Sequence, residues 1–146
     1  IPVTVRREIA GQRGTLQFVS GTTLSEHDRV AGAKWGWPTC SLEKQWSAMY
    51  VFDVLINNSA RSPLSMLYYP DDWQLLLLNH EQAFSMGKGR PAYLRNSELV
   101  VGDEWRSTLL ELTDEKLRAN LGDVLDKRRL GALARRRDAL IRESRR

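Results

Sequence analysis

The feature that most constrains the fold is a long segment of helical periodicity that stops abruptly in a polar loop. Apolar and aromatic side chains recur at three- and four-residue spacing across residues 42–56, and Ser41 directly before them is a residue type that often caps helix N-termini. Residues 57–63 are polar and end in proline, which disfavours continuation of a helix. The sequence therefore predicts one helix over residues 42–56, followed by a loop.

Two β-hairpins are predicted, one on each side of this helix in the sequence. Alternating apolar and polar residues predict strands over residues 2–9 and 14–20, joined by a turn at residues 11–14. Further along, residues 66–69 and 74–78 form short apolar runs separated by turn-forming residues, which predicts a second, tight hairpin.

The remaining regular structure is predicted to be helical. Residues 25–30 are expected to form one helical turn inside the connection that follows the first hairpin. From Asp103 onward the pattern predicts three helices: a first one, a short second one capped by Thr113 and stopped by Gly122, and a basic third one over residues 127–143. The fold class is therefore α+β.

Length and composition fit a single domain over residues 1–146. The chain is 42% hydrophobic and 27% charged, and a chain of 146 residues can bury a core without disulfide or metal staples. Its only cysteine is Cys40, and only His27 and His80 could join it as metal ligands. Counting therefore excludes a disulfide framework and a four-ligand zinc site built from Cys and His.

The sequence predicts a cytoplasmic protein without a membrane span. The longest apolar run, residues 75–78, is far shorter than the roughly 20 residues that a transmembrane helix needs. The low cysteine usage favours a reducing compartment. The chain begins at Ile1 instead of methionine, which indicates a processed product or part of a longer chain.

The positive charge is concentrated at the C-terminal end. Residues 114–146 contain 11 lysines and arginines against 6 acidic residues. This pattern fits either an ordinary solvated helix face or a patch that binds nucleic acid or anionic lipid. The consecutive Arg135, Arg136 and Arg137 cannot all face one way on a helix, so we expect one of them to point toward the body of the protein, which weakens the patch interpretation.

Two segments resemble the catalytic machinery of a known family. Residues 52–65 read FDVLINNSARSPLS and resemble the catalytic loop of bacterial phosphatidylinositol 3- and 4-kinase-like and HipA-like atypical kinases, roughly Phe-Asp-x-Leu-Ile-x-Asn-x-Asp-Arg-x-x-x-Asn. Residues 75–84 read LLLLNHEQAF and are similar to the strand that ends in the metal-binding Asp-His-x-x-x-Phe of that family. The opening residues 1–5 and 14–17 are similar to its last N-lobe hairpin, so the likeness spans roughly residues 1–84.

The resemblance implies a kinase-like C-lobe. Residues 41–146 would form this mainly helical lobe, and residues 1–20 would be a hairpin from the N-lobe or hinge side. Four residues of the catalytic machinery are retained: Asp53, Asn58, Arg61 and His80. Asp53 lies inside the predicted helix, where we expect it to brace the loop through hydrogen bonds, and we expect His80 to hydrogen-bond a neighbouring backbone and not to bind a metal.

Three departures decide what the resemblance implies about activity. Ala60 stands at the position of the catalytic aspartate, Ser65 at that of the metal-binding asparagine, and Asn79 at that of the metal-binding aspartate. Alanine cannot accept a proton, and an amide lacks the charge that holds Mg²⁺ against phosphates. No Gly-rich phosphate loop precedes the first hairpin, and no strand lysine can be assigned. The resemblance therefore implies a non-catalytic pseudokinase that holds neither cofactor nor metal.

Protein binding or scaffolding is the function that this reasoning favours, with a protein partner or a missing N-lobe as the binding partner. The first alternative is an active atypical lipid or protein kinase that uses ATP and Mg²⁺, with a compensated site and an N-lobe outside this sequence. A second is nucleic-acid binding through the basic C-terminal helix. A third is a chance likeness, in which the loop merely connects a helix to a hairpin.

Three tryptophans in predicted loops are candidates for a partner surface. Trp35, Trp37 and Trp73 serve either hinge packing or partner binding, because aromatic side chains carry much of the energy of interfaces. If the resemblance holds, the outer face of the first hairpin needs a cover, which would be a partner or the connection around Trp35 and Trp37. A hairpin left bare would count against the resemblance.

Overall fold

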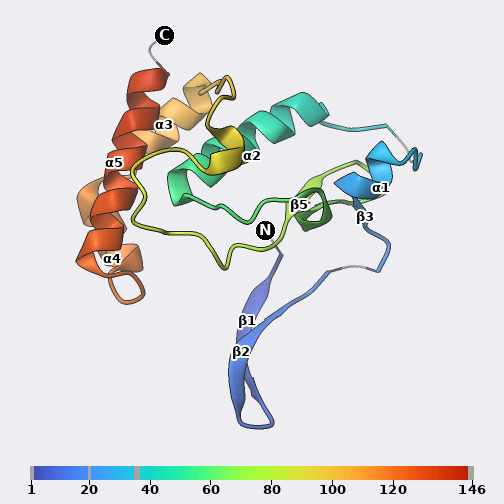
Figure 1. Cartoon of the computed structure of the whole chain (residues 1–146), viewed down its shortest axis with the longest axis horizontal. Helices are drawn as coiled ribbons and strands as arrows, with labels where there is room; N and C mark the ends of the chain where they lie inside the picture. The colour runs from blue at the N-terminus through green and yellow to red at the C-terminus, as the bar shows by residue number, and fades with distance from the viewer. Residues whose placement is uncertain (1, 20, 35–36, 145–146) are drawn as a thin grey trace. The chain divides into compact units, whose positions relative to one another are not determined.

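The computed structural model describes residues 2–19, 21–34 and 37–144 and has an α+β fold (Figure 1). In this part of the chain an N-terminal hairpin and a small three-stranded sheet accompany five α-helices. The strands are β1 (Thr4–Ile9), β2 (Gln12–Gln17), β3 (Leu24–Ser25), β4 (Met66–Tyr68) and β5 (Leu75–Leu77). The helices are α1 (Glu26–Val30), α2 (Leu42–Ile56), α3 (Asp103–Glu111), α4 (Asp114–Leu121) and α5 (Lys127–Glu143), with 3₁₀ turns η1 (Pro63–Ser65) and η2 (Ala92–Leu94).

The chain divides into two compact units. The first unit contains Ile1–Leu42 and Arg61–Asn79, and the second contains Glu43–Ala60 and His80–Arg146. None of the described helices has the length and apolar character that crossing a bilayer requires.

The first hairpin confirms the predicted strand pair but moves its turn. β1 and β2 pair antiparallel from Thr4 opposite Gln17 to Ile9 opposite Gln12. The turn is therefore Ala10–Gly11, whose φ angles of 51° and 78° fit a tight two-residue hairpin turn. The prediction of a turn at residues 11–14 was wrong, because Gly14 lies within β2.

The hairpin is exposed on both faces. Every residue of β1 and β2 is exposed. Trp37 does not supply the cover expected from the connection, because it is itself 92% exposed. Trp35 lies outside the described residues.

The second hairpin is confirmed and belongs to a three-stranded antiparallel sheet of order β3-β4-β5. Met66 pairs with Leu77 and Tyr68 with Leu75. The short strand β3 was not predicted, since two residues cannot show an alternating pattern. Ser25, the last residue of β3, also caps α1: its hydroxyl accepts from the Asp28 amide over 3.2 Å, and its own amide donates to the Asp28 carboxylate over 3.1 Å. The expected helical turn at residues 25–30 is thus confirmed.

The interior of the first unit combines aromatic packing with a buried carboxylate. Glu26 is buried and accepts two hydrogen bonds of 2.7 Å from the Arg29 guanidinium. The Tyr68 hydroxyl donates to the same carboxylate over 2.9 Å. Trp73 is 8% exposed, and its ring lies 5.6 Å from that of Tyr68. Of the two interpretations of Trp73, the structure favours packing.

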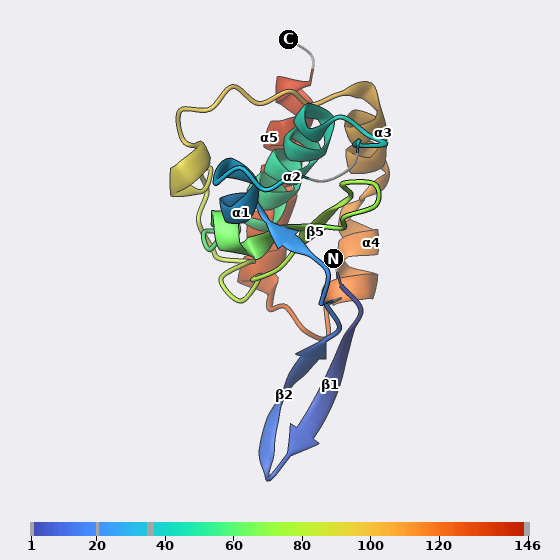
Figure 2. The same ribbon diagram turned by 90° about the vertical axis from the view of Figure 1, so that its right-hand side faces the viewer.

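The second unit is built around α2 and the three C-terminal helices. The predicted bounds of α2 and α5 are confirmed, and Thr113 caps α4 as predicted, with its hydroxyl accepting from the Lys116 amide over 3.3 Å. α3 and α4 each contact α5 (Figure 2). The buried core residues come from all of these elements and from the segment between α2 and α3: Val51, Val54, Leu55, Leu94, Val101, Leu109, Leu117, Leu130, Leu133 and Leu140.

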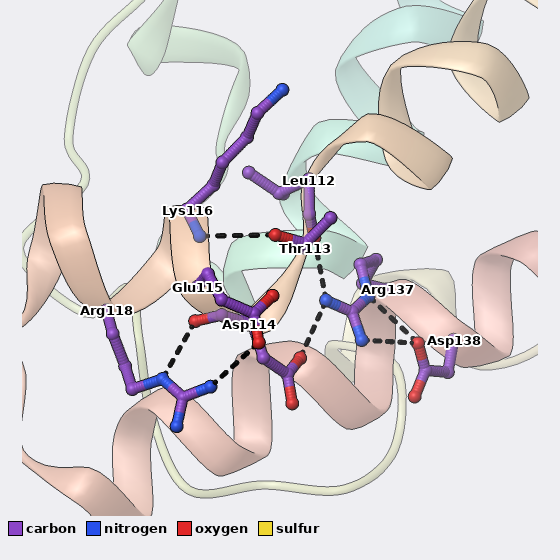
Figure 3. Close-up of polar contacts among 8 residues, drawn as sticks. All are labelled: Leu112, Thr113, Asp114, Glu115, Lys116, Arg118, Arg137 and Asp138. Atoms are coloured by element: carbon purple, nitrogen blue, oxygen red, sulfur yellow. Dashed lines mark hydrogen bonds and ion pairs between the residues drawn. The ribbon is translucent and has the colours of Figure 1, made fainter.

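Arg137 of α5 fastens the junction between α3 and α4 (Figure 3). Its Nη1 donates to the Leu112 carbonyl over 2.6 Å and to Asp114 Oδ1 over 2.9 Å, and its Nε donates to Asp138 over 2.8 Å. Burial opposes the charge of this guanidinium, but the bonds to Asp138 and Asp114 outweigh burial and raise the pKa of Arg137. The side chain therefore serves the packing of the helices.

Candidate functional site

The end of α2 carries a polar cluster, here called the brace: Asp53, Asn58 and the more exposed Tyr93. Asp53 and Asn58 are both 0% exposed. The Asn58 amide group donates through Nδ2 to Asp53 Oδ1 over 3.3 Å, and the Tyr93 hydroxyl donates to Asp53 Oδ2 over 2.6 Å. The backbone N–H of Asn58 also donates to the Asp53 carbonyl over 2.9 Å. Asp53 thus holds the loop by hydrogen bonds, as expected for a residue inside the helix.

Asn57 and Asn58 hold the backbone of the loop after α2 by side-chain hydrogen bonds. Asn57 has φ 51°, a left-handed conformation that asparagine tolerates better than most residues. Its Nδ2 donates to the carbonyls of Gly89 over 3.0 Å and Gly87 over 3.3 Å. Asn58 Oδ1 accepts from the backbone N–H of Ala60 over 3.1 Å, so the backbone entering position 60 is positioned by a buried side chain.

Arg136 of α5 ties the end of α2 to the segment after His80. Its side chain is buried, with the residue 2% exposed. Nε donates to the Leu55 carbonyl over 2.8 Å, and Nη1 donates to the carbonyls of Gly87 over 2.8 Å and Ser85 over 3.1 Å. Nη2 is buried without a hydrogen-bond partner among the described residues. Burial, together with the charge of Arg135, lowers the pKa of Arg136 to about 10.

These contacts confirm that one of the three consecutive arginines points inward, and it is Arg136. Arg137 is also engaged, by Asp114 and Asp138, while Arg135 is exposed. Two of the three cations are therefore used inside the second unit.

Ala60 has no reactive group, and the ring of His80 packs against a neighbouring aromatic side chain. Ala60 is half-buried, and its methyl group can neither accept nor donate a proton. The imidazole of His80 packs edge-on against Phe52, with ring centroids 5.9 Å apart, and the His80 backbone carbonyl accepts from the Ala83 amide over 3.0 Å. Nearby, the exposed Ser59 hydroxyl donates to Gln82 over 2.9 Å.

In the first unit, Ser65 and Arg61 stabilise the start and end of the second hairpin. Ser65 is 0% exposed, and its hydroxyl accepts from the Ser62 amide and donates to the Ser62 carbonyl, both over 3.0 Å. Arg61 Nη1 donates to the carbonyls of Leu78 over 2.7 Å and Ser65 over 3.3 Å. The Ser65 hydroxyl is therefore engaged in a local turn, and Arg61 bonds to backbone.

Asn79 follows β5 directly, at the place where the resembled family has its metal-binding aspartate. It is exposed and has φ 55°. Ser65 and Asn79 belong to the first unit and Ala60 to the second. Among the described residues, no group of three or more His, Cys, Asp and Glu side chains could hold a metal ion.

One pocket of the second unit lies away from the brace. It has a volume of about 390 Å³ and is lined by residues of α4 and α5 with those flanking them: Asp114, Leu117, Arg118, Lys127, Leu130, Gly131 and Ala134. Within the second unit α2 is followed by a hydrogen-bonded loop whose residue 60 is alanine, which has no group that could act as an acid or base.

Sequence reasoning missed two residues that hold this loop. Tyr93 lies in the 3₁₀ turn η2 and reaches Asp53 from a part of the chain for which no motif was assigned. Gly87 supplies a carbonyl to both Asn57 and Arg136, and a Cβ added to it would lie 2.9 Å from the Asn57 amide nitrogen. The glycine was visible as a loop residue, but only the fold reveals that a side chain there would crowd the amide.

Comparison of the chain with protein-family models, with curated proteins and with solved structures finds no match. The likeness to atypical kinases thus depends on the sequence of residues 1–84 alone.

Proposed function

We propose that the chain is a degenerate, kinase-like C-lobe of the bacterial phosphatidylinositol 3-/4-kinase-like and HipA-like type, which binds or scaffolds another protein in the cytoplasm and does not transfer phosphate. One observation carries the proposal. The loop that resembles a catalytic loop is held by the fully buried Asp53 and Asn58 and by the hydroxyl of the exposed Tyr93, yet the position it leads to holds only the methyl group of Ala60.

The three altered positions each remove a different requirement of phosphoryl transfer. Ala60 cannot orient or deprotonate an attacking hydroxyl. The Ser65 hydroxyl is already satisfied by Ser62, and Asn79 has no charge to hold Mg²⁺. Loss of a single electrostatic or acid–base group commonly costs several kcal/mol of transition-state stabilisation, so the combined loss argues against the active-kinase alternative.

The exposure of the first hairpin bears on the proposed kinase-like lobe. Every residue of β1 and β2 is exposed, and this counts against the resemblance. The proposal therefore requires that a protein partner or an N-lobe cover the hairpin. The proposed role is therefore one of binding, with the hairpin as the part that needs a partner.

Calorimetric titration of Mg-ATP into the chain tests the loss of nucleotide chemistry. The matched sample is the triple variant Ala60→Asp, Ser65→Asn, Asn79→Asp, and titration in EDTA gives the Mg-independent background. Circular dichroism melting checks that the variant folds, because Ser65 is buried. We expect no Mg-dependent heat from the parent chain.

The variant then separates the possible results. Mg-dependent binding by the variant alone would support both the assignment of the three positions and their loss of function. Silence from both proteins would mean that this lobe alone has no nucleotide site, which also supports a non-catalytic role. Mg-dependent binding by the parent would overturn the proposal and bring the compensated-kinase alternative forward.

A further inference from the structure

The two faces of the first hairpin differ in chemistry. Successive side chains of a strand point to opposite faces, so the register assigns each residue to one of them. One face carries the large apolar side chains: Val5 opposite Leu16, Ile9 near the turn, and Val3 beside Phe18, whose amide donates to the Val3 carbonyl. The other face carries polar pairs: Thr4 with Gln17, Arg6 with Thr15 and Glu8 with Arg13. The first set is called the apolar hairpin face below.

Polar side chains on one face of the hairpin bond to one another, whereas the side chains of the apolar hairpin face stay exposed. Gln17 donates to the Thr4 hydroxyl over 3.0 Å, and Arg13 pairs with Glu8 over 3.4 Å. On the apolar hairpin face the exposed fractions run from 38% for Val5 to 76% for Val3. A two-stranded hairpin in water is marginally stable, and contiguous exposed apolar surface marks interaction sites. The apolar hairpin face therefore requires a cover.

The positive charge of the hairpin indicates that a covering surface should be acidic. Arg7 lies on the apolar hairpin face, opposite Gly14, which has no side chain and no atom within 4 Å of where a Cβ would be. The hairpin holds Arg6, Arg7 and Arg13 against the single acid Glu8. Arg7 Nη1 donates to the Arg6 carbonyl over 2.9 Å, and a covering surface that places a carboxylate in the open space beside Gly14 would pair with the remaining donors of this guanidinium. A second copy of this face would instead bring a second Arg7 into the same apolar layer, where like charges repel.

The width and length of the hairpin indicate which secondary structure could cover the apolar hairpin face. Two paired strands form a ribbon about 10 Å wide, which is the diameter of one α-helix with its side chains. From Val3 to Ile9 the strand advances about 20 Å at roughly 3.3 Å per residue. A helix covers that length with about 13 residues.

We propose that the apolar hairpin face docks an acidic amphipathic helix of about 13 residues, presented by a partner protein, whose apolar stripe covers this face and whose carboxylate pairs with Arg7. This inference rests on the proposed binding function and names its partner class. It requires neither a nucleotide nor the residues of the loop after α2.

Synthetic peptides of defined sequence test the proposal by calorimetric titration into the whole chain. The first peptide has leucines at helical spacing i, i+3, i+4 and i+7 and glutamates elsewhere. The second has the same composition in scrambled order, and the third replaces each glutamate by lysine. We expect saturable binding of the first peptide only.

Variants on the two faces localise the binding. Val5→Thr with Leu16→Thr keeps good strand-forming residues but removes apolar contact, and we expect affinity for the acidic peptide to fall at least about tenfold. Arg7→Glu should reverse the preference toward the lysine peptide. The matched control Arg6→Glu makes the same charge change on the polar face and should alter affinity by less than about threefold. Hydrogen exchange of the β1 and β2 amides verifies that each variant keeps the hairpin.

Three results would overturn the inference: equal binding of the scrambled peptide, equal binding by the Val5→Thr, Leu16→Thr variant with its hairpin intact, or self-association in sedimentation that Leu16→Thr abolishes. The last would identify a second copy as the occupant. Binding of Mg-ATP by the parent would refute the non-catalytic function while leaving the peptide results unchanged, so the two failures are distinguishable.

Discussion

Removing the Tyr93 hydroxyl isolates the energy of the brace with little change in shape. Tyr93→Phe deletes the hydrogen bond of 2.6 Å to Asp53 Oδ2, while Asp53 stays fully buried. Hydrogen bonds to charged groups contribute roughly 1.5–3 kcal/mol. Tyr93 is 38% exposed, so water can partly replace its hydroxyl, which favours the lower end of this range. We therefore expect the free energy of unfolding to fall by about 1.5–2 kcal/mol.

A double-mutant cycle with Asp53→Ala assigns that loss to the pair. Urea unfolding followed by circular dichroism gives each free energy of unfolding. In the Asp53→Ala background, Tyr93→Phe should cost no more than about 0.5 kcal/mol, because its partner is gone. Tyr69→Phe is the matched control, since no hydrogen bond of the Tyr69 hydroxyl is present among the described residues, and it should change stability little. If Tyr93→Phe costs the same with and without Asp53, or no more than Tyr69→Phe, the brace does not stabilise the fold in the way argued here.

Two further predictions concern α5. Arg136→Met removes a buried charge but leaves the Leu55 and Ser85 carbonyls without this donor, at roughly 1–3 kcal/mol each, while the Gly87 carbonyl still accepts from Asn57. Urea unfolding should show a net loss of about 2 kcal/mol, and an unchanged or raised stability would contradict this account. Asp126 caps α5, and the bond from the Arg129 amide lowers the pKa of its carboxyl below 3.8. Its charge-dependent contribution is present above that value and disappears as pH falls through the lower folded pKa. Asp126→Asn keeps a cap but should flatten the fall in melting temperature between about pH 5 and pH 2, and an unchanged slope would refute the assignment.

Long helices could be predicted because their signals are local. The bounds of α2 and α5 agree with the expected residues 42–56 and 127–143, since periodicity and the residues that flank each helix lie within the segment itself. The turn of the first hairpin was misplaced because Gly11 and Gly14 are both turn-type residues. The register decides between them, and it depends on the pairing of Val5 with Leu16 across the two strands.

The loop at the end of α2 could be predicted only in part. The role of Asp53 followed from the resemblance, and Asn58 was among the retained residues. Tyr93 could not be found, because its contact joins residues 40 positions apart that share no periodic pattern. For the arginines of α5, helix geometry required that one turn inward, but only the position of the Leu55, Ser85 and Gly87 carbonyls determines that it is Arg136.

The burial of Asp53 and Asn58 bears on the proposal that the loop after α2 is a degenerate catalytic loop. A connection between a helix and a hairpin runs normally at the surface and has no need of a buried carboxylate, because burying polar groups costs free energy unless each is hydrogen-bonded. Asp53 and Asn58 are nonetheless fully buried, and their hydrogen bonds reach as far as the backbone of Ala60. Such a framework keeps a defined backbone at a position that has no reactive side chain. This combination of a hydrogen-bonded backbone and an unreactive side chain supports the proposal of a degenerate catalytic loop in a binding domain.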